Sequence, residues 1–138
     1  RLVAEMMILA GESAARYSQE NSLPIPFRNQ PQPELPSEEE LIQLPAGPVR
    51  ACALRRCMPR SEISIPPARH ASLGLDTYTQ VTSPIRRYTD LLAHFQLKAH
   101  LRGDDLPFSA QELQELTMSI STTVQEAVSV ERQTNRYW

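Results

Sequence analysis

Ten of the twelve prolines in this 138-residue sequence fall between Pro24 and Pro67. Proline lacks a backbone N–H, and its ring clashes with the preceding turn of a helix, so this stretch cannot form one long helix or a central strand. It is expected to be an irregular connection that runs over the surface and contains only short elements. The prolines therefore divide the chain into helical ends and a loop-rich middle.

Short elements are nevertheless expected within and just after this connection. Ser37 and Glu40 form the serine–glutamate pair of a capping box, which predicts that a helix begins there. Pro59 is expected to end a second, basic helix. Alternation of polar and apolar residues predicts short strands. The expected elements are helices over residues 37–44 and 50–58 and a strand over residues 61–65, with residues 78–81 either a second strand or an extended entry to the next helix.

Longer helices are expected at both ends of the chain. Apolar residues recur at three- and four-residue steps over residues 1–20. A second helix is predicted from Ser83, a good N-cap that is followed by proline, to Gly103. A last helix is predicted from Ser109, which forms a capping box with Glu112. The expected buried stripes are Ile85, Tyr88, Leu92, Phe95 and Ala99 in the second helix and Leu113, Leu116, Ile120, Val124 and Ala127 in the last.

Composition excludes several classes of protein. No apolar run approaches the roughly 20 residues of a membrane-spanning helix, and no cleavable signal is recognisable at the start. Two cysteines, Cys52 and Cys57, are too few for a disulfide scaffold, and their spacing matches no common zinc site. A reducing, cytoplasmic setting is the default expectation. We expect the sequence to be a segment of a longer protein.

Charge is arranged in blocks that the net charge of −2 hides. Residues 1–49 and 103–138 each carry −4, whereas residues 50–102 carry eight arginines and one lysine against three acids, or +6. Clustered arginine is typical of a surface that contacts phosphate, because guanidinium groups bind phosphate oxygens through paired hydrogen bonds. The alternative is an ordinary solvated surface. The same choice applies to the arginines near residue 55, Arg56 among them.

Arg86 and Arg87 fall at the expected start of the second helix, which is the unfavourable end for cations. The helix dipole places partial positive charge there, and each like charge costs about 0.3–1 kcal/mol. A bound phosphate would reconcile these facts, since free N–H groups at a helix start also need acceptors. The alternative is that both side chains turn back to acids such as Glu5 or Asp90.

Four further polar residues stand out by position. Glu131 extends the stripe of the last helix by four residues beyond Ala127, so it either pairs with an arginine near the anion site or is solvated where the helix leaves the core. Asp90 and His94 share a helix face, and a structural hydrogen-bonded pair is favoured over a catalytic one. Tyr78 is a candidate for stacking on bases.

The 25 residues from His70 to His94, HASLGLDTYTQVTSPIRRYTDLLAH, are specific enough to indicate a family. They resemble the signature of the ribonuclease II / ribonuclease R family of exoribonucleases. The opening helix, the residues around Ser61 and the pair Glu131-Arg132 also resemble the family at the corresponding places. The resemblance covers nearly the whole chain and is strongest over residues 61–138.

The resemblance implies a mostly helical α+β fold in which residues 1–138 are the C-terminal portion of the catalytic domain. It also implies a processive, hydrolytic 3′→5′ exoribonuclease that degrades single-stranded RNA to nucleoside 5′-monophosphates. In the family an aspartate cluster binds Mg²⁺, and those ligands are expected upstream of this segment. By motif position, Arg86 is expected beside the scissile phosphate and Glu131 close to it, as the catalytic residues. The expected RNA contacts are Thr82, Ser83, Arg87, Tyr78 and Arg56.

One departure from the family bears on specificity. The family usually has a carboxylate, implied to contact the terminal ribose, where this chain has Ala4. Tight discrimination of RNA from DNA through the 2′-hydroxyl is therefore not implied here. An alternative from another functional class is a non-catalytic RNA-binding or assembly protein that keeps the scaffold but has lost hydrolysis.

Overall fold

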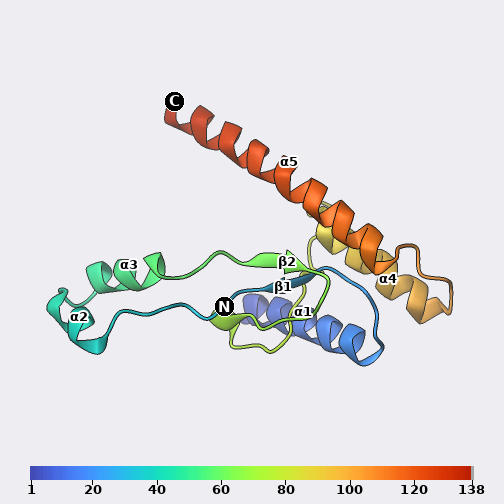
Figure 1. The fold of residues 1–138 in the computed structure, drawn as a ribbon, viewed down its shortest axis with the longest axis horizontal. Helices are drawn as coiled ribbons and strands as arrows, with labels where there is room; N and C mark the ends of the chain where they lie inside the picture. The colour runs from blue at the N-terminus through green and yellow to red at the C-terminus, as the bar shows by residue number, and fades with distance from the viewer. Residues whose placement is uncertain (138) are drawn as a thin grey trace.

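The computed structural model describes residues 1–137 and shows an α+β fold that is mostly helical, as expected (Figure 1). A two-stranded antiparallel sheet is the β component of the described part. In chain order the elements are α1 (Leu2–Glu20), β1 (Phe27–Asn29), α2 (Glu38–Gln43), α3 (Pro48–Arg56), β2 (Glu62–Ser64), the 3-10 turn η1 (Ala71–Leu73), α4 (Tyr88–Arg102) and α5 (Ala110–Tyr137).

The body of the molecule forms where α1, the β1–β2 ribbon and α4 meet (Figure 1). Its core is small because each element contributes only one or two apolar side chains. Ala15 comes from α1, Ile25 and Phe27 from the chain entering β1, and Ala93 from α4, with Val81 packed alongside. Burial of these groups supplies the main stabilising term for such a fold, at about 25 cal/mol per Å² of apolar surface.

Helix α1 lies close to the segment 77–81 at Gly11. A Cβ atom there would lie 2.3 Å from the backbone oxygen of Thr79 and 2.5 Å from Cε2 of Tyr78. Thr79 is itself fixed, since its hydroxyl donates to the carbonyl of Pro26 at 2.7 Å. Residues 77–79 are therefore buried beside α1, and the segment 77–81 is not the ladder strand that was one of its expected forms.

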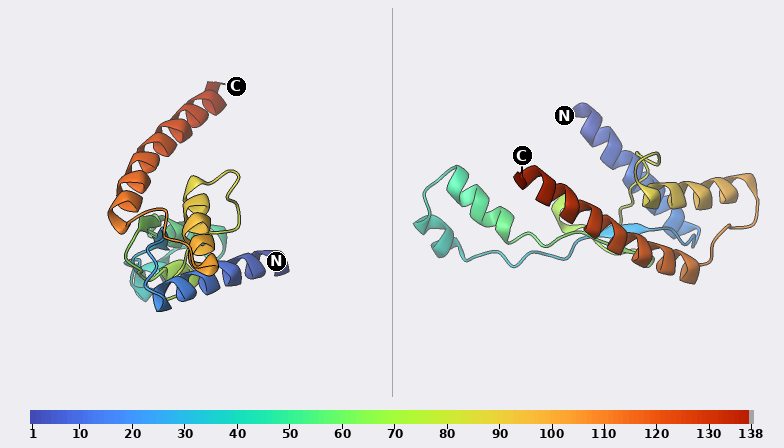
Figure 2. Two further views of the ribbon diagram at one scale, coloured as in Figure 1. Left: turned by 90° about the vertical axis from the view of Figure 1, so that its right-hand side faces the viewer. Right: turned by 90° about the horizontal axis from the view of Figure 1, so that it is seen from above.

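The proline-rich middle forms an arm that projects from the body and carries α2 and α3 (Figures 1 and 2). The capping box is confirmed: the Glu40 N–H donates to Ser37 Oγ at 3.3 Å, and the Ser37 N–H donates to Glu40 Oε2 at 3.0 Å. Arg50 ties the two helices together, because its guanidinium donates to the carbonyl of Leu44 at 2.8 Å. Helix α3 begins at Pro48, two residues before the expected start.

Helix α4 begins at Tyr88, not at Ser83 as predicted from the Ser-Pro signal. The N–H groups of Arg86 and Arg87 donate to the Ser83 carbonyl at 3.2 and 3.0 Å, which makes a separate turn before the helix. Arg87 is extended, with φ −126° and ψ 109°, and it breaks the helical path. The helix ends at Gly103, whose φ of 77° is left-handed, as expected for a C-terminal glycine.

The late start of α4 changes which side chains it buries. The expected stripe is wrong at three positions, because Ile85, Tyr88 and Phe95 are exposed, and right at Leu92. Gln96 is fully buried instead: its amide donates to the carbonyls of Pro24 and Phe108 and so joins two loops to the helix. The buried residues of α4 are Asp90, Leu92, Ala93 and Gln96.

Helix α5 packs on the body only through its first turns. Its capping box is confirmed, since the Ser109 N–H donates to Glu112 Oε2 at 2.8 Å and the Glu112 N–H donates to Ser109 Oγ at 3.3 Å. The hydrogen bond from the Ser109 N–H lowers the pKa of the Glu112 carboxyl, and the bond from the Ser109 hydroxyl lowers it further. Leu113 and Thr117 are buried, but Val124 is exposed, so the predicted stripe fails where the helix leaves the body (Figure 1).

Among residues 1–137, no helix combines the length and the apolar character that crossing a bilayer requires.

Replacing Gly11 by alanine should destabilise the protein by about 1–3 kcal/mol, because the new methyl group overlaps Thr79 and Tyr78. Helix propensity alone predicts the opposite sign, a gain of about 1 kcal/mol. Urea unfolding distinguishes the two, with the exposed Ser13→Ala in the same helix as the matched control. Equal or higher stability of the Gly11 variant would contradict the close packing described here.

Candidate nucleic-acid interface

Two adjoining cavities lie between α5 and the body, with volumes of about 410 and 440 Å³. They share Arg28, Ile63, Ser121 and Gln125 in their walls, so together they form one continuous groove. We call it the arginine groove, after the four arginines that line it. These are Arg28 and Arg60 in the first cavity and Arg28, Arg86 and Arg87 in the second.

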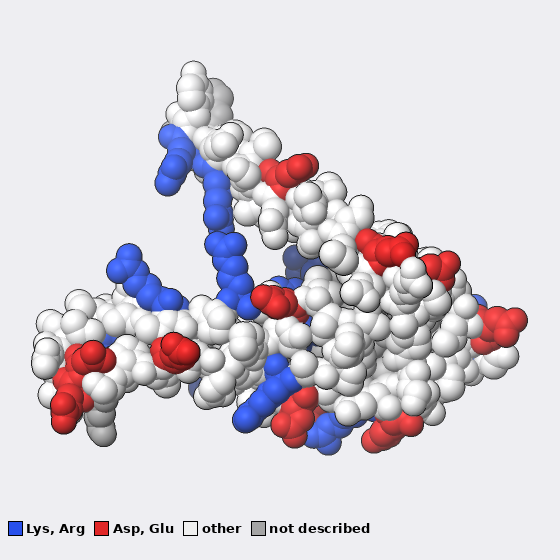
Figure 3. All heavy atoms as spheres, in the orientation of Figure 1, with Lys and Arg blue, Asp and Glu red and all other residues white. Residues whose placement is uncertain are grey.

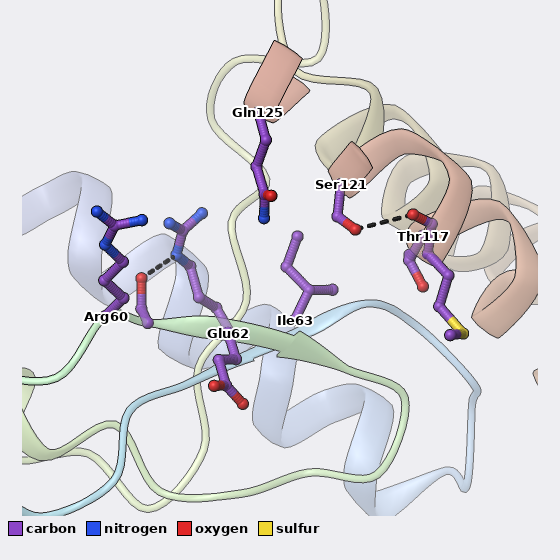
Figure 4. A pocket seen from close by; sticks show the side chains of 9 residues that line it. Arg60, Glu62, Ile63, Thr117, Ser121 and Gln125 are labelled. Carbon is purple, nitrogen blue, oxygen red and sulfur yellow. Dashed lines mark hydrogen bonds between the residues drawn. The ribbon is translucent and has the colours of Figure 1, made fainter. Parts of the chain in front are cut away.

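The arginine groove is strongly basic because the single acid in its walls faces elsewhere. Side chains alternate along a strand, and Figure 4 shows Ile63 pointing toward α5 while the Glu62 carboxylate points to the opposite side of β2. In Figure 3, Lys and Arg side chains cross the space between the exposed end of α5 and the body. The groove therefore favours an anionic ligand.

Asp90 fixes the turn that precedes α4. Its side chain is fully buried, its Oδ2 accepts the Ser83 N–H at 2.9 Å, and the same oxygen lies 3.3 Å from Arg87 Nε. One helical turn later, His94 Nε2 lies 2.7 Å from the Val81 carbonyl oxygen. The predicted Asp90–His94 pair is wrong: both residues face the loop before the helix, and each holds a different backbone group of it.

The two adjacent arginines have different environments. Arg87 turns back to Asp90, as one alternative anticipated, and its side chain is 27% exposed. Arg86 lines the second cavity, is exposed, and forms no ion pair with any of the residues described. Because α4 begins at Tyr88, Arg86 lies ahead of the first helical turn, and the dipole penalty inferred from the sequence does not apply to it. What remains is an uncompensated cation beside a cavity.

Arg28 is a candidate functional residue that the sequence interpretation missed. Its Nε donates to Ser61 Oγ at 2.9 Å and its Nη1 donates to Gln80 Oε1 at 2.8 Å. Burial lowers the pKa of the His70 imidazole, and the positive charge of Arg28 lowers it further. The signal was hidden because Arg28 belongs to the acidic block 1–49 and its partners are 33 and 52 residues away.

Tyr78 occupies a packing position in this chain. Its side chain is 9% exposed, and its ring meets that of His70 edge-on at 5.7 Å between centroids. Burial raises the pKa of its hydroxyl, against the opposing charges of Arg87 and Arg28. Tyr78 lines neither cavity of the arginine groove. The base contact predicted for it stays a prediction.

The remaining predicted contacts lie at different distances from the groove. Thr82 and Ser83 are half-buried beside it, and Thr82 Oγ1 accepts from Arg87 Nη2 at 3.5 Å. Arg56 is exposed at the end of α3, on the arm. Glu131 is exposed on the projecting part of α5 and lines neither cavity, so the described residues place it in solvent and not beside Arg86.

Within residues 1–137, no group of three or more His, Cys, Asp or Glu side chains is placed to hold a metal ion. Because Mg²⁺ is bound through carboxylate oxygens and water, the residues present do not fit such a site.

Comparison with known proteins identifies the family. The profile described as the RNB domain matches residues 1–103. The chain belongs to the RNB-domain family. It is 68% identical over 138 residues to an uncharacterized ribonuclease of Synechocystis sp. and 43% identical over 140 residues to the chloroplastic/mitochondrial ribonuclease II of Arabidopsis thaliana. Each match covers the whole chain but only 21% and 17% of the relative, so this RNB-domain chain spans about a fifth of their length.

Solved structures share the fold. The RNase R of Mycoplasma genitalium, determined in complex with ribose-methylated single-stranded RNA, matches 98% of this chain with a TM-score of 0.73 and 23% identity. The match covers 27% of that protein. The resemblance to the ribonuclease II / ribonuclease R family is thus confirmed, and the two relatives named above are described as ribonucleases.

Asp90→Ala should destabilise the protein by about 3 kcal/mol, because it leaves a partly buried Arg87 and the Ser83 N–H without their partner. Asp90→Asn should cost less, since its amide oxygen can still accept the Ser83 N–H. Urea unfolding of both variants measures the difference, with the exposed Asp105→Ala as control. Equal stability of Asp90→Ala and Asp105→Ala would show that the contacts of Asp90 with Ser83 and Arg87 do not stabilise the fold.

Proposed function

We propose that the full-length protein is a processive, hydrolytic 3′→5′ exoribonuclease that degrades single-stranded RNA to nucleoside 5′-monophosphates. In this proposal the segment supplies the arginine-lined wall of the RNA path. The observation that carries it is Arg86, an unpaired guanidinium beside a 440 Å³ cavity on a turn clamped by buried Asp90. Ribonuclease relatives over the whole chain support the same reading.

The proposed role of Arg86 is to bind the phosphodiester that is cut. Negative charge grows on the phosphoryl oxygens during hydrolysis, and a guanidinium held in place can stabilise it with two parallel hydrogen bonds. Preorganisation matters because a side chain that must first reorient loses part of this benefit. The turn before α4 fixes the backbone from which Arg86 projects, since Ser83 and Arg87 are both held by Asp90.

We further propose that activity depends on Mg²⁺ and that the metal ligands lie in the part of the protein outside this chain. Glu131 is the proposed second catalytic residue, acting from α5 on the terminal nucleotide. Its exposed position on the projecting end of the helix leaves its carboxylate free to meet RNA or the rest of the protein.

Arg86→Ala in the full-length protein should lower kcat about 100- to 1,000-fold while RNA binding changes much less, because one donor to the developing charge is lost. The assay is release of mononucleotides from a single-stranded RNA, with binding measured separately. Arg102→Ala, an exposed arginine at the end of α4, is the control. Turnover like that of the unmodified protein would remove Arg86 from the mechanism.

The isolated 138 residues should release no mononucleotides from a 3′-labelled RNA, because the described residues hold no metal site. The full-length protein, assayed in parallel with Mg²⁺, should degrade the same RNA. Clear activity of the segment alone would mean that the metal ligands are misplaced in this proposal. A full-length protein that binds RNA but never cuts it would favour the non-catalytic alternative.

A further inference from the structure

We infer that Arg28 and Arg60 form a second phosphate-binding subsite, separate from Arg86, that grips the RNA backbone without taking part in the chemistry. The inference rests on the proposed function, because it assigns RNA as the ligand. It concerns the 410 Å³ cavity, which Arg28 and Arg60 line and Arg86 does not. A cavity of that size lies within the range of small-molecule and nucleotide sites.

The first observation is that Arg28 is held in place by neutral groups. Ser61 and Gln80 accept hydrogen bonds from Nε and Nη1, at 2.9 and 2.8 Å. Neither partner carries charge, so they orient the guanidinium without neutralising it. Because Arg28 lies in β1 opposite Ile63 of β2, the ribbon also fixes its backbone. The result is a preorganised cation with donors to spare, since arginine has five N–H groups.

The second observation is that no acid balances the charge in this cavity. The ion pairs of the described chain are Arg16–Glu12 and Arg87–Asp90, and neither involves Arg28 or Arg60. Glu62 is the one acid in the wall, and its carboxylate points to the far side of the strand (Figure 4). Two cations facing one cavity repel each other unless an anion lies between them.

The third observation is the chemistry of the remaining wall. Figure 4 shows Arg60 on one side and Gln125 of α5 on the other, both pointing into the space between β2 and α5. Arg60 makes no hydrogen bond or ion pair with the residues described, so its guanidinium is available to a ligand. Two arginines and a neutral amide suit a phosphodiester, which needs charge and donors but no apolar pocket.

The two cavities are continuous through Arg28, which lines both. A single strand lying in the arginine groove therefore passes Arg60, then Arg28, then Arg86. This order separates the roles: Arg86 acts on the reacting phosphate, while Arg28 and Arg60 hold phosphates farther from the end. Phosphate contacts of this kind position a nucleic acid without reading its sequence.

The test is binding of short single-stranded RNA to the full-length protein in EDTA, which prevents turnover, over a range of salt concentrations. Arg60→Gln should raise Kd about 5- to 20-fold and reduce the slope of log Kd against log salt by about 0.7, the value for one contact to a single strand. At saturating RNA, kcat should stay within about threefold. The control is Arg102→Gln. Unchanged affinity and slope in Arg60→Gln would overturn the inference.

Arg28 needs a second pair of variants, because its hydrogen bonds also support the fold. Arg28→Gln should reproduce the loss of affinity and slope, whereas Arg28→Lys, which keeps the charge but not the paired hydrogen bonds, should retain most of the slope. Thermal unfolding records any loss of stability in both. Equal loss of slope in the two variants would show a structural role and would contradict a phosphate contact.

A double-mutant cycle with the RNA localises the contact. Replacing one phosphodiester of the RNA by an uncharged methylphosphonate should weaken binding to the unmodified protein when that phosphate is the one that Arg28 contacts. The same replacement should cause no further loss of affinity in Arg28→Gln. If no linkage behaves this way, the subsite is overturned while degradation of RNA by the same preparation still supports the proposed function. If that preparation never degrades RNA, the proposed function fails, whatever the binding result.

Discussion

The arrangement of the site depends on the carboxylate of Asp90, which is buried in the first turn of α4. Burying an acid is costly unless its oxygens find donors and its charge a partner. Asp90 meets this requirement at Oδ2, which accepts the Ser83 N–H and lies beside Arg87, whereas Oδ1 is buried without a hydrogen-bond partner among the described residues. The same two contacts close the turn before the helix, so the requirement of one buried charge determines where the exposed guanidinium of Arg86 leaves the backbone.

The rest of the fold places a basic wall opposite α5. The β1–β2 ribbon carries Arg28 toward the groove and turns Glu62 away from it, because neighbouring strand residues face opposite sides. Helix α5 is anchored by Leu113 and Thr117 and then leaves the body, which keeps the groove open beneath it. Apolar side chains are exposed both on α5 and on α1. The chain spans about a fifth of the length of the relative from Synechocystis sp..

Local signals predicted local structure well. Both capping boxes and the end of α4 at Gly103 are confirmed, since each depends on residues within four positions of one another. The start of α4 was predicted wrongly because Asp90 accepts the Ser83 N–H, and the chain makes a separate turn at Ser83 before the helix begins. Arg28 was missed for a similar reason: its partners, Ser61 and Gln80, come close only after the chain has folded.

The most direct test of the central claim is a structure of the full-length protein with a non-hydrolysable single-stranded RNA. The account predicts the guanidinium of Arg86 within about 2.7–3.1 Å of oxygens of the terminal phosphodiester, with the Ser83 N–H still bonded to Asp90. An RNA path outside the arginine groove, or an Arg86 paired with an acid from elsewhere in the protein, would contradict it.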